Sequence, residues 1–150
     1  MELSLKRRVL SNQRGFTLIE IMVVVVILGI LATFIVPKLL DRPEQARRTK
    51  ATVDIRALEG SLGLFKLDNG FFPTTEQGLE ALVNKPTTGR IPSKYADGGY
   101  VKNVPLDPWG NAYVYLCPGV HSEFDIISYG ADGEAGGEGN NADVNSWELE

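Results

Sequence analysis

An apolar run near the N-terminus dominates the pattern of hydrophobic and polar positions along the chain. Residues 16–36 read FTLIEIMVVVVILGILATFIV, and Glu20 is the only charged residue among them. A helix rises about 1.5 Å per residue, so a run of this length reaches about 30 Å, the thickness of a bilayer core. We therefore expect a membrane-spanning helix over residues 16–37.

The chain then turns polar, and its apolar residues recur at helical spacing. Intervals of 4, 3, 4 and 3 separate Ala51, Ile55, Leu58, Leu62 and Phe65. This spacing predicts an amphipathic helix whose apolar stripe packs on a sheet of the same domain. Asp41, Pro43 and Glu44 indicate either a fresh helix start or a kink in one long helix. The helix should end near Asn69 and Gly70, which form a stop signal.

Shorter elements follow. Thr74 and Gln77 have the spacing of a capping box, which predicts a short helix. Residues 84–100 are dense in Gly, Pro and polar residues and are typical of a long loop. The segments AYVYLC (112–117) and EFDIISYG (123–130) are rich in β-branched and aromatic residues and predict two strands of a hairpin.

Charge is unevenly distributed. The formal net charge is −4, which argues against a nucleic-acid partner. Residues 1–15 carry a net charge of +3, whereas residues 103–150 contain nine acids and no Lys or Arg. Cys117 is the single cysteine, so no intrachain disulfide forms, and the single His121 excludes a site that needs two histidines.

The basic leader predicts a cytoplasmic N-terminus, with the chain beyond Pro37 translocated. No A-x-A-like cleavage site follows the apolar run, but Gly15 stands just before it. Cleavage after Gly15 would create a new amine at Phe16, four residues before Glu20. Residues four apart share a helix face, so amine and carboxylate could pair, within one chain or between neighbours. The alternative is a Glu20 that stays hydrated at the membrane interface.

The last residues of the sequence form an acidic, glycine-rich segment, SYGADGEAGGEGNNADVNSWELE. Glycines allow tight turns, and a hard cation such as Ca²⁺ takes about 6–8 oxygen ligands. This composition fits a calcium loop or a solvated acidic tail. The order of residues matches neither an EF-hand loop nor a stack of glycine-rich nonapeptides.

The stretch RGFTLIEIMVVVVILGILATFIVP resembles the N-terminal signature of type IV pilins and pseudopilins. The segments ALEGSLGLFKLDNGFFPTTEQGLEALV and YVKNVPLDPWGNAYVY resemble, more narrowly, the major pseudopilin of the bacterial type II secretion system. The resemblance implies an α+β fold of type IV pilin type. In this fold a long N-terminal helix packs by its second half on a small antiparallel sheet.

The resemblance also implies a function. A prepilin peptidase would cleave after Gly15 and methylate the amine of Phe16, and Glu20 would pair with the Phe16 amine of an adjacent subunit. Residues 1–15 would be a cytoplasmic leader, 16–37 the transmembrane and filament-core helix, and 38–150 a periplasmic domain. The subunit would form a homopolymer, the periplasmic pseudopilus, which drives export of folded proteins across the outer membrane. Its further partners would be minor pseudopilins and an inner-membrane assembly platform.

Calcium in the C-terminal loop is likewise implied by the resemblance. Asp132 and Asp143 would supply side-chain oxygens. Carbonyls of Tyr129 and Glu134 and an oxygen of Asn140 or Asn141 would complete the shell. The ion would order a loop that otherwise repels itself.

Three other interpretations compete with this one. A type IV pilus pilin or a minor pseudopilin would share the N-terminal signature. A monomeric, membrane-anchored calcium-binding protein of the envelope would need neither cleavage after Gly15 nor a charge at Glu20. For an enzyme, His121, Ser122 and Asp125 lie close in sequence, but adjacency is not triad geometry, so we expect no catalysis.

Overall fold

The computed structural model describes residues 15–149, without the side chains of residues 34–42. The predicted leader therefore lies outside the described residues, apart from Gly15. The chain consists of two compact units, residues 1–40 and residues 41–150, and each is described by itself.

Helix α1 runs through both units, from Leu18 to Asn69, over 52 residues. The sequence around Pro43 left open a fresh helix start or a kink, and the structure has a single helix there. At its end, Gly70 adopts a φ of 79° and its N–H donates to the Lys66 carbonyl at 2.6 Å. This left-handed residue ends the helix where Asn69 and Gly70 predicted it, because glycine takes positive φ without steric cost.

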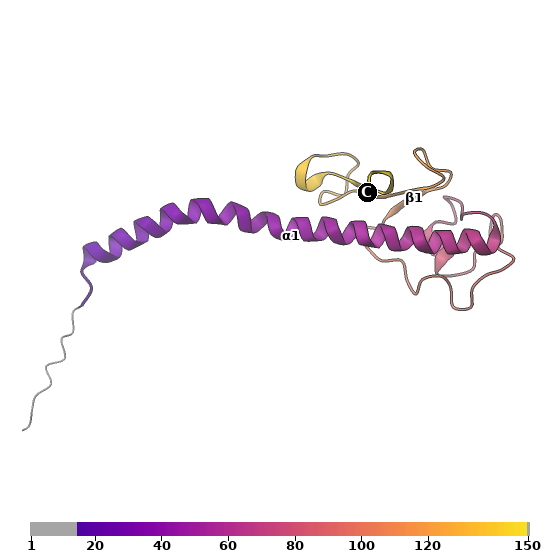
Figure 1. Ribbon diagram of the computed structural model, residues 1–150, viewed down its shortest axis with the longest axis horizontal. Helices are drawn as coiled ribbons and strands as arrows, with labels where there is room; N and C mark the ends of the chain where they lie inside the picture. Colours follow the sequence, from indigo (N-terminus) through magenta and orange to yellow (C-terminus); the bar gives the residue numbers. More distant parts are fainter. Residues whose placement is uncertain (1–14, 150) are drawn as a thin grey trace, which may run out of the picture. The chain divides into compact units, whose positions relative to one another are not determined.

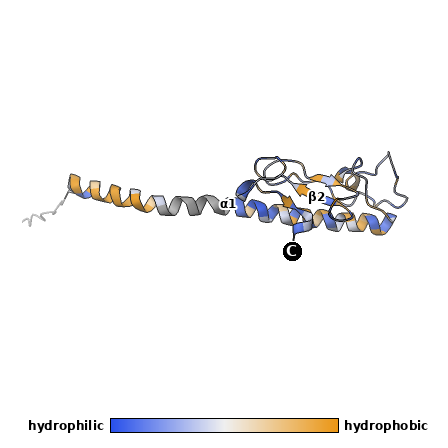
Figure 2. Ribbon diagram, turned by 90° about the horizontal axis from the view of Figure 1, so that it is seen from above, coloured by the Kyte–Doolittle hydropathy of each residue, from blue (hydrophilic) through white to orange (hydrophobic). Residues whose placement is uncertain are grey.

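The first part of α1 consists mainly of apolar residues, which Figure 2 shows in orange. Every large apolar side chain from Phe16 to Leu31 is at least 47% exposed. The predicted span over residues 16–37 continues into positions whose side chains are not described. Within the part of the chain that the structure describes, no helix combines the length and the apolar character that crossing a membrane requires.

The second part of α1 packs on the rest of the outer unit, residues 41–150. Its predicted apolar stripe is buried, with exposures between 0% and 2%: Ala51, Ile55, Leu58, Leu62 and Phe65. The core that it joins contains residues of a short 3₁₀ helix, η1 (Leu79–Leu82), and of the sheet. Figure 1 shows β1 (Val114–Leu116) beside this part of the helix. The predicted packing of the stripe within its own domain is confirmed.

The sheet has three antiparallel strands in the order β1-β2-β3, with β2 at Asp125–Ser128 and β3 at Val144–Asn145. The first two strands are the predicted hairpin, although shorter than their sequence signals. β3 was not predicted, because it lies inside the acidic segment. It is flanked by two 3₁₀ helices, η2 (Gly139–Asn141) and η3 (Ser146–Glu148). The α+β fold inferred from the sequence is confirmed.

The predicted capping box after α1 is present. The Thr74 N–H donates to Gln77 Oε1 at 3.0 Å, and the Gln77 N–H donates to Thr74 Oγ1 at 3.3 Å. The turn leads into η1 rather than into an α-helix. Leu79 and Leu82 of η1 enter the core, so the apolar face predicted for this segment is confirmed in a tighter helix.

Candidate functional site

The start of α1 carries a capping box that the sequence analysis missed. The Glu20 N–H donates to Thr17 Oγ1 at 3.3 Å, and the Thr17 N–H donates to Glu20 Oε2 at 3.4 Å. Thr-x-x-Glu before an apolar run is a known signature of a helix N-terminus, so the signal was available. A carboxylate in the first turn also interacts favourably with the positive end of the helix dipole.

Glu20 therefore has a role within its own chain before any neighbour is considered. Its side chain is exposed, and among residues 15–149 its carboxylate accepts one long hydrogen bond, from Thr17. A carboxylate carries about four lone-pair sites, so capacity for further donors remains. Phe16 is still bonded to Gly15 here, and its nitrogen is an amide rather than an amine. The predicted pairing between the two residues stays a prediction.

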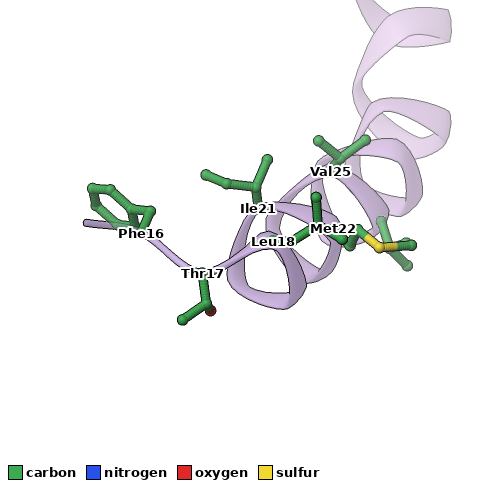
Figure 3. Close-up of a pocket in the computed structure, with 7 residues that line it drawn as sticks. Phe16, Thr17, Leu18, Ile21, Met22 and Val25 are labelled. Carbon is green, nitrogen blue, oxygen red and sulfur yellow. The ribbon is translucent and has the colours of Figure 1, made fainter. Parts of the chain in front are cut away.

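An apolar surface surrounds this helix start. A shallow pocket of about 620 Å³ is lined by Phe16, Thr17, Leu18, Ile21, Met22, Val25 and Val26. Figure 3 shows Ile21 and Val25 one turn apart on the same side of the helix, while Thr17 points away from them. A contiguous exposed apolar surface of this kind marks a contact with another protein or with a membrane.

The acidic segment folds back on itself at its glycines. A Cβ at Gly130 would lie 3.0 Å from the Ala142 carbonyl oxygen, and one at Gly137 would lie 2.6 Å from the Asn141 carbonyl oxygen. Both glycines have positive φ, 65° and 89°. The two limbs of the loop thus approach so closely that only glycine fits at these positions.

Asp143 is the most unusual side chain in this loop. Its Oδ2 accepts the Gly136 N–H at 2.9 Å, whereas its Oδ1 is buried and has no hydrogen-bond partner among the described residues. A buried oxygen without a donor is costly, which makes it a candidate ligand for a cation. A pocket of about 240 Å³ lies beside it, lined by Gly136, Gly137, Ala142, Asp143, Asn145 and Glu148.

Of the predicted calcium ligands, Asp143 alone lines this pocket. Asp132 Oδ1 accepts the N–H of Glu134 at 3.2 Å within its own turn. No group of three His, Cys, Asp or Glu side chains among residues 15–149 is arranged to hold a metal ion. A hard cation at Asp143 would therefore depend on carbonyl and amide oxygens as well. Glu148 and Asn145 line the same pocket but were not predicted, because they lie beyond the glycine-rich stretch.

Arg48 anchors the far limb of the loop to α1. Its guanidinium donates to the carbonyl of Ala142 at 2.5 Å and to that of Asp143 at 3.3 Å. Charged donors make the stronger hydrogen bonds of proteins. The two residues that precede β3 are thus held by the helix, and the position of Asp143 is fixed from outside the loop.

The loop between β1 and β2 is organised around a buried carboxylate. Asp125, 1% exposed, accepts backbone N–H groups of Val120 at 2.6 Å, His121 at 3.1 Å and Ser122 at 3.2 Å. Burial alone would raise the pKa of Asp125, but these donors and the His121 ring hold it below its ordinary value.

Asp125 also decides how the three residues considered for a catalytic triad are arranged. Both the His121 ring, at 3.2 Å, and the Ser122 hydroxyl, at 3.4 Å, contact the carboxylate itself. In a triad the imidazole stands between hydroxyl and carboxylate. Here the carboxylate is central, and the His121 ring stacks on Trp147 at 3.8 Å instead. This stacking of His121 on Trp147 connects the loop between β1 and β2 to η3.

Comparison with known proteins gives a consistent result over residues 10–36 and 38–147. The family described as "Type II secretion system (T2SS), protein G" matches residues 38–147. The motif described as "Prokaryotic N-terminal methylation motif" matches residues 10–36. The first match covers most of the outer unit, and the second covers the start of α1, with Gly15, Phe16 and Glu20.

Relatives match over nearly their full length. The type II secretion system core protein G of Vibrio cholerae is 55% identical over 94% of this chain and 96% of its own. The core protein G of Pseudomonas aeruginosa is 55% identical over 91% and 96%. The crystal structure of the major pseudopilin from the type 2 secretion system of enterohaemorrhagic Escherichia coli is similar, with a TM-score of 0.68 and 44% identity. It covers 75% of this chain and 92% of that one. The chain therefore belongs to the type II secretion system protein G family.

Proposed function

We propose that this chain is a structural subunit that polymerises into the periplasmic pseudopilus of a type II secretion system and thereby drives export of folded proteins across the outer membrane. The observation that carries the proposal is the first part of α1. It exposes apolar side chains on every face, and its own chain covers none of those that the structure describes. Such a helix needs an apolar environment, which a bilayer supplies before assembly and neighbouring helices supply after it.

The match to the methylation motif supports the processing steps of this proposal. Cleavage after Gly15 would remove the basic leader, and methylation would follow on the amine of Phe16. The subunit would cross the inner membrane once, with its N-terminus in the cytoplasm and residues 38–150 in the periplasm. A prepilin peptidase, minor pseudopilins and an inner-membrane assembly platform would be its partners.

Glu20 would then have two roles. Within the chain it caps α1 with Thr17, and between chains it would pair with the Phe16 amine of the next subunit. The variant Glu20→Gln separates these roles, because glutamine also completes a capping box but carries no charge. Glu20→Leu removes both. If the charge sets the contact between subunits, both variants lose polymer, although Glu20→Gln keeps the helix start.

The experiment measures sheared polymer from cells that carry the full secretion apparatus, with mass spectrometry of the mature N-terminus. The proposal requires a methylated Phe16 as the first residue in the wild type, and polymer loss in both Glu20 variants. Normal polymer in Glu20→Leu, or an intact leader on polymerised subunits, would overturn it. Normal polymer in Glu20→Gln alone would reduce Glu20 to a helix cap.

We also propose that the C-terminal loop binds Ca²⁺ at Asp143, whose buried Oδ1 lacks a donor among the described residues. Asp132, carbonyls of Tyr129 and Glu134, and an oxygen of Asn140 form the rest of the proposed shell. An ion that binds only the folded state stabilises it by mass action. A chelator should therefore lower the melting temperature of the wild type. It should have little effect on Asp143→Asn, while the control Glu138→Gln should respond like the wild type.

A further inference from the structure

A pocket of about 340 Å³ lies beside β1 in the outer unit. It is lined, among others, by residues 104–106, by Leu79 and Glu80 of η1, and by Tyr115 of β1. Most of the lining side chains are apolar, and that of Leu106 is 59% exposed. Pockets that combine an apolar lining with a few polar groups are the usual binding sites of proteins. This pocket shares no lining residue with the pockets at the start of α1 and beside Asp143.

The backbone of Tyr115 points toward the free edge of the sheet. β1 is an edge strand, and β2 pairs with it on one side. Ile126, the partner of Tyr115 in the register, donates its N–H to Ser146 Oγ at 3.0 Å, on the side of β3. Since hydrogen-bonded and non-hydrogen-bonded pairs alternate along an antiparallel ladder, Tyr115 and Ile126 form a non-hydrogen-bonded pair. The N–H and C=O of Tyr115 therefore point away from β2, where they have no hydrogen-bond partner among residues 15–149.

The described chain pairs with this edge on either side of Tyr115 but not at Tyr115 itself. After β1, the Cys117 N–H donates to Thr75 Oγ1 at 2.8 Å, and the Cys117 carbonyl accepts the Thr75 N–H at 3.3 Å. Before β1, Ala112 forms a β-bridge with Leu106. Thr75 and Leu106 both line the pocket, so the gap between these two contacts opens into it. An unpaired stretch of a strand edge is a template for the backbone of another extended chain.

The charge at the pocket favours a cationic partner. Glu80 is the only charged residue among residues 15–149 that lines it, and its side chain is exposed. Lys85 lines a neighbouring pocket together with Glu80, but neither Lys85 nor any other described residue forms an ion pair with it. A carboxylate of this kind beside an apolar surface attracts a cation and disfavours an acid, which gives the pocket a preference in charge.

We infer that this pocket binds an extended segment of another protein in which an apolar residue stands two positions from a lysine or arginine. Residues two positions apart in an extended chain share a face. The backbone of the segment pairs with Tyr115, its apolar side chain lies against Leu79 and Leu106, and its cationic side chain faces Glu80. The inference goes beyond the proposed function and does not depend on polymerisation.

The chain contains five tyrosines, which makes a selective test possible. The full-length chain in detergent micelles is labelled with ¹⁵N-tyrosine, so that NMR shows one amide signal for each. The probe is an acetylated and amidated pentapeptide of sequence Lys-Val-Leu-Val-Lys. It should shift the Tyr115 signal and slow hydrogen exchange there, because the Tyr115 N–H becomes hydrogen-bonded. Tyr129, which does not line the pocket, should keep its signal.

Two changes test the contacts separately. N-methylation of the central leucine of the peptide removes the donor to the Tyr115 carbonyl and should weaken binding about tenfold. Glu80→Lys reverses the charge at the pocket and should weaken binding by about the same factor. The matched control is Glu76→Lys, at an equally exposed acid one turn earlier that does not line the pocket, and it should bind like the wild type. Melting temperatures show whether both variants fold, and the methylated peptide tests the wild type whatever they show.

Four results would overturn the inference. The first is no change at Tyr115, and the second is an equal change at Tyr129. The third is equal binding of the acidic peptide Glu-Val-Leu-Val-Glu, because Glu80 would then select nothing. The fourth is a Tyr115 shift that appears when the chain is concentrated without peptide, which would assign the pocket to a second copy. A shift confined to the pocket, with losses in the methylated peptide and in Glu80→Lys but not in Glu76→Lys, supports it.

Discussion

The two parts of α1 share one secondary structure but differ in where their apolar side chains go. Between Phe16 and Leu31 the large apolar residues lie on all faces, and each is at least 47% exposed. Between Ala51 and Phe65 the stripe residues are buried to 2% or less. Helical periodicity alone does not bury a side chain. The second part has a sheet to pack on within its own unit, whereas no described residue of the chain covers the apolar side chains of the first part.

The largest effect should come from the buried stripe. Phe65 is fully buried and contacts Phe71, Tyr95 and Tyr100, with ring centroids 5.7, 6.4 and 5.3 Å away. Phe65→Ala should destabilise the outer unit by about 3–5 kcal/mol, because it removes apolar burial and leaves a cavity. Urea unfolding of the full-length chain in mild detergent measures this loss. A change below about 1 kcal/mol would show that the core collapses around the deletion.

A smaller effect is expected at Asp125, and it should depend on pH. Because its pKa lies below the ordinary value of 3.8, the folded state is stabilised above that value. This contribution is lost as pH falls through the pKa of the folded state. Asp125→Asn should cost about 1.5–3 kcal/mol at neutral pH, the value of hydrogen bonds to a charged group. The difference from the wild type should shrink in acid, and exposed Asp97→Asn should show neither effect.

Trp109 offers a third, weaker test of the packed region. Its Nε1–H donates to Oε1 of the buried Glu44 at 2.7 Å, and Glu44 keeps a second contact to Arg47 at 3.2 Å. Trp109→Phe should therefore cost about 1–2 kcal/mol, measured by thermal unfolding. Trp147→Phe is the control, since the Trp147 indole N–H has no hydrogen-bond partner in the described part of the chain. Equal losses in both variants would assign the effect to ring size rather than to the hydrogen bond.

The smallest effect on the outer unit should come from the first part of α1. Leu28 is 59% exposed, and Leu28→Ala should change the unfolding free energy of the outer unit by no more than about 0.5 kcal/mol. The contrast with Phe65→Ala tests the comparison between the two parts. A loss at Leu28 similar to that at Phe65 would mean that the first part contributes to the stability of the outer unit.

Much of the fold was predictable because its signals are local. The stripe from Ala51 to Phe65, the stop at Gly70 and the Thr74 capping box each depend on residues a few positions apart. β3 was missed for the opposite reason. Val144 pairs with Ser128 across sixteen positions, and its acidic, glycine-rich surroundings carry no strand signal.

Some residues of the candidate site were likewise predictable from local sequence signals, and others were not. Gly15, Phe16 and Glu20 stand out in sequence, since an acid in an apolar run is conspicuous without any structure. The Thr17–Glu20 capping box was equally local and could have been found. The burial of Asp143 could not, because it depends on Gly136 across the loop and on Arg48 from α1.

By itself, the sequence determined the two parts of α1, the place where the helix ends, and the residues that set its N-terminus. The sequence could do so because helices depend on contacts between residues three or four positions apart. Only the tertiary structure decided which acids are buried. Asp125 accepts hydrogen bonds from backbone N–H groups of its own hairpin loop. Asp143 Oδ1 is buried within the C-terminal loop, which Arg48 of α1 holds in place. Burial of a polar atom depends on neighbours that are distant in sequence, and composition does not encode where they meet.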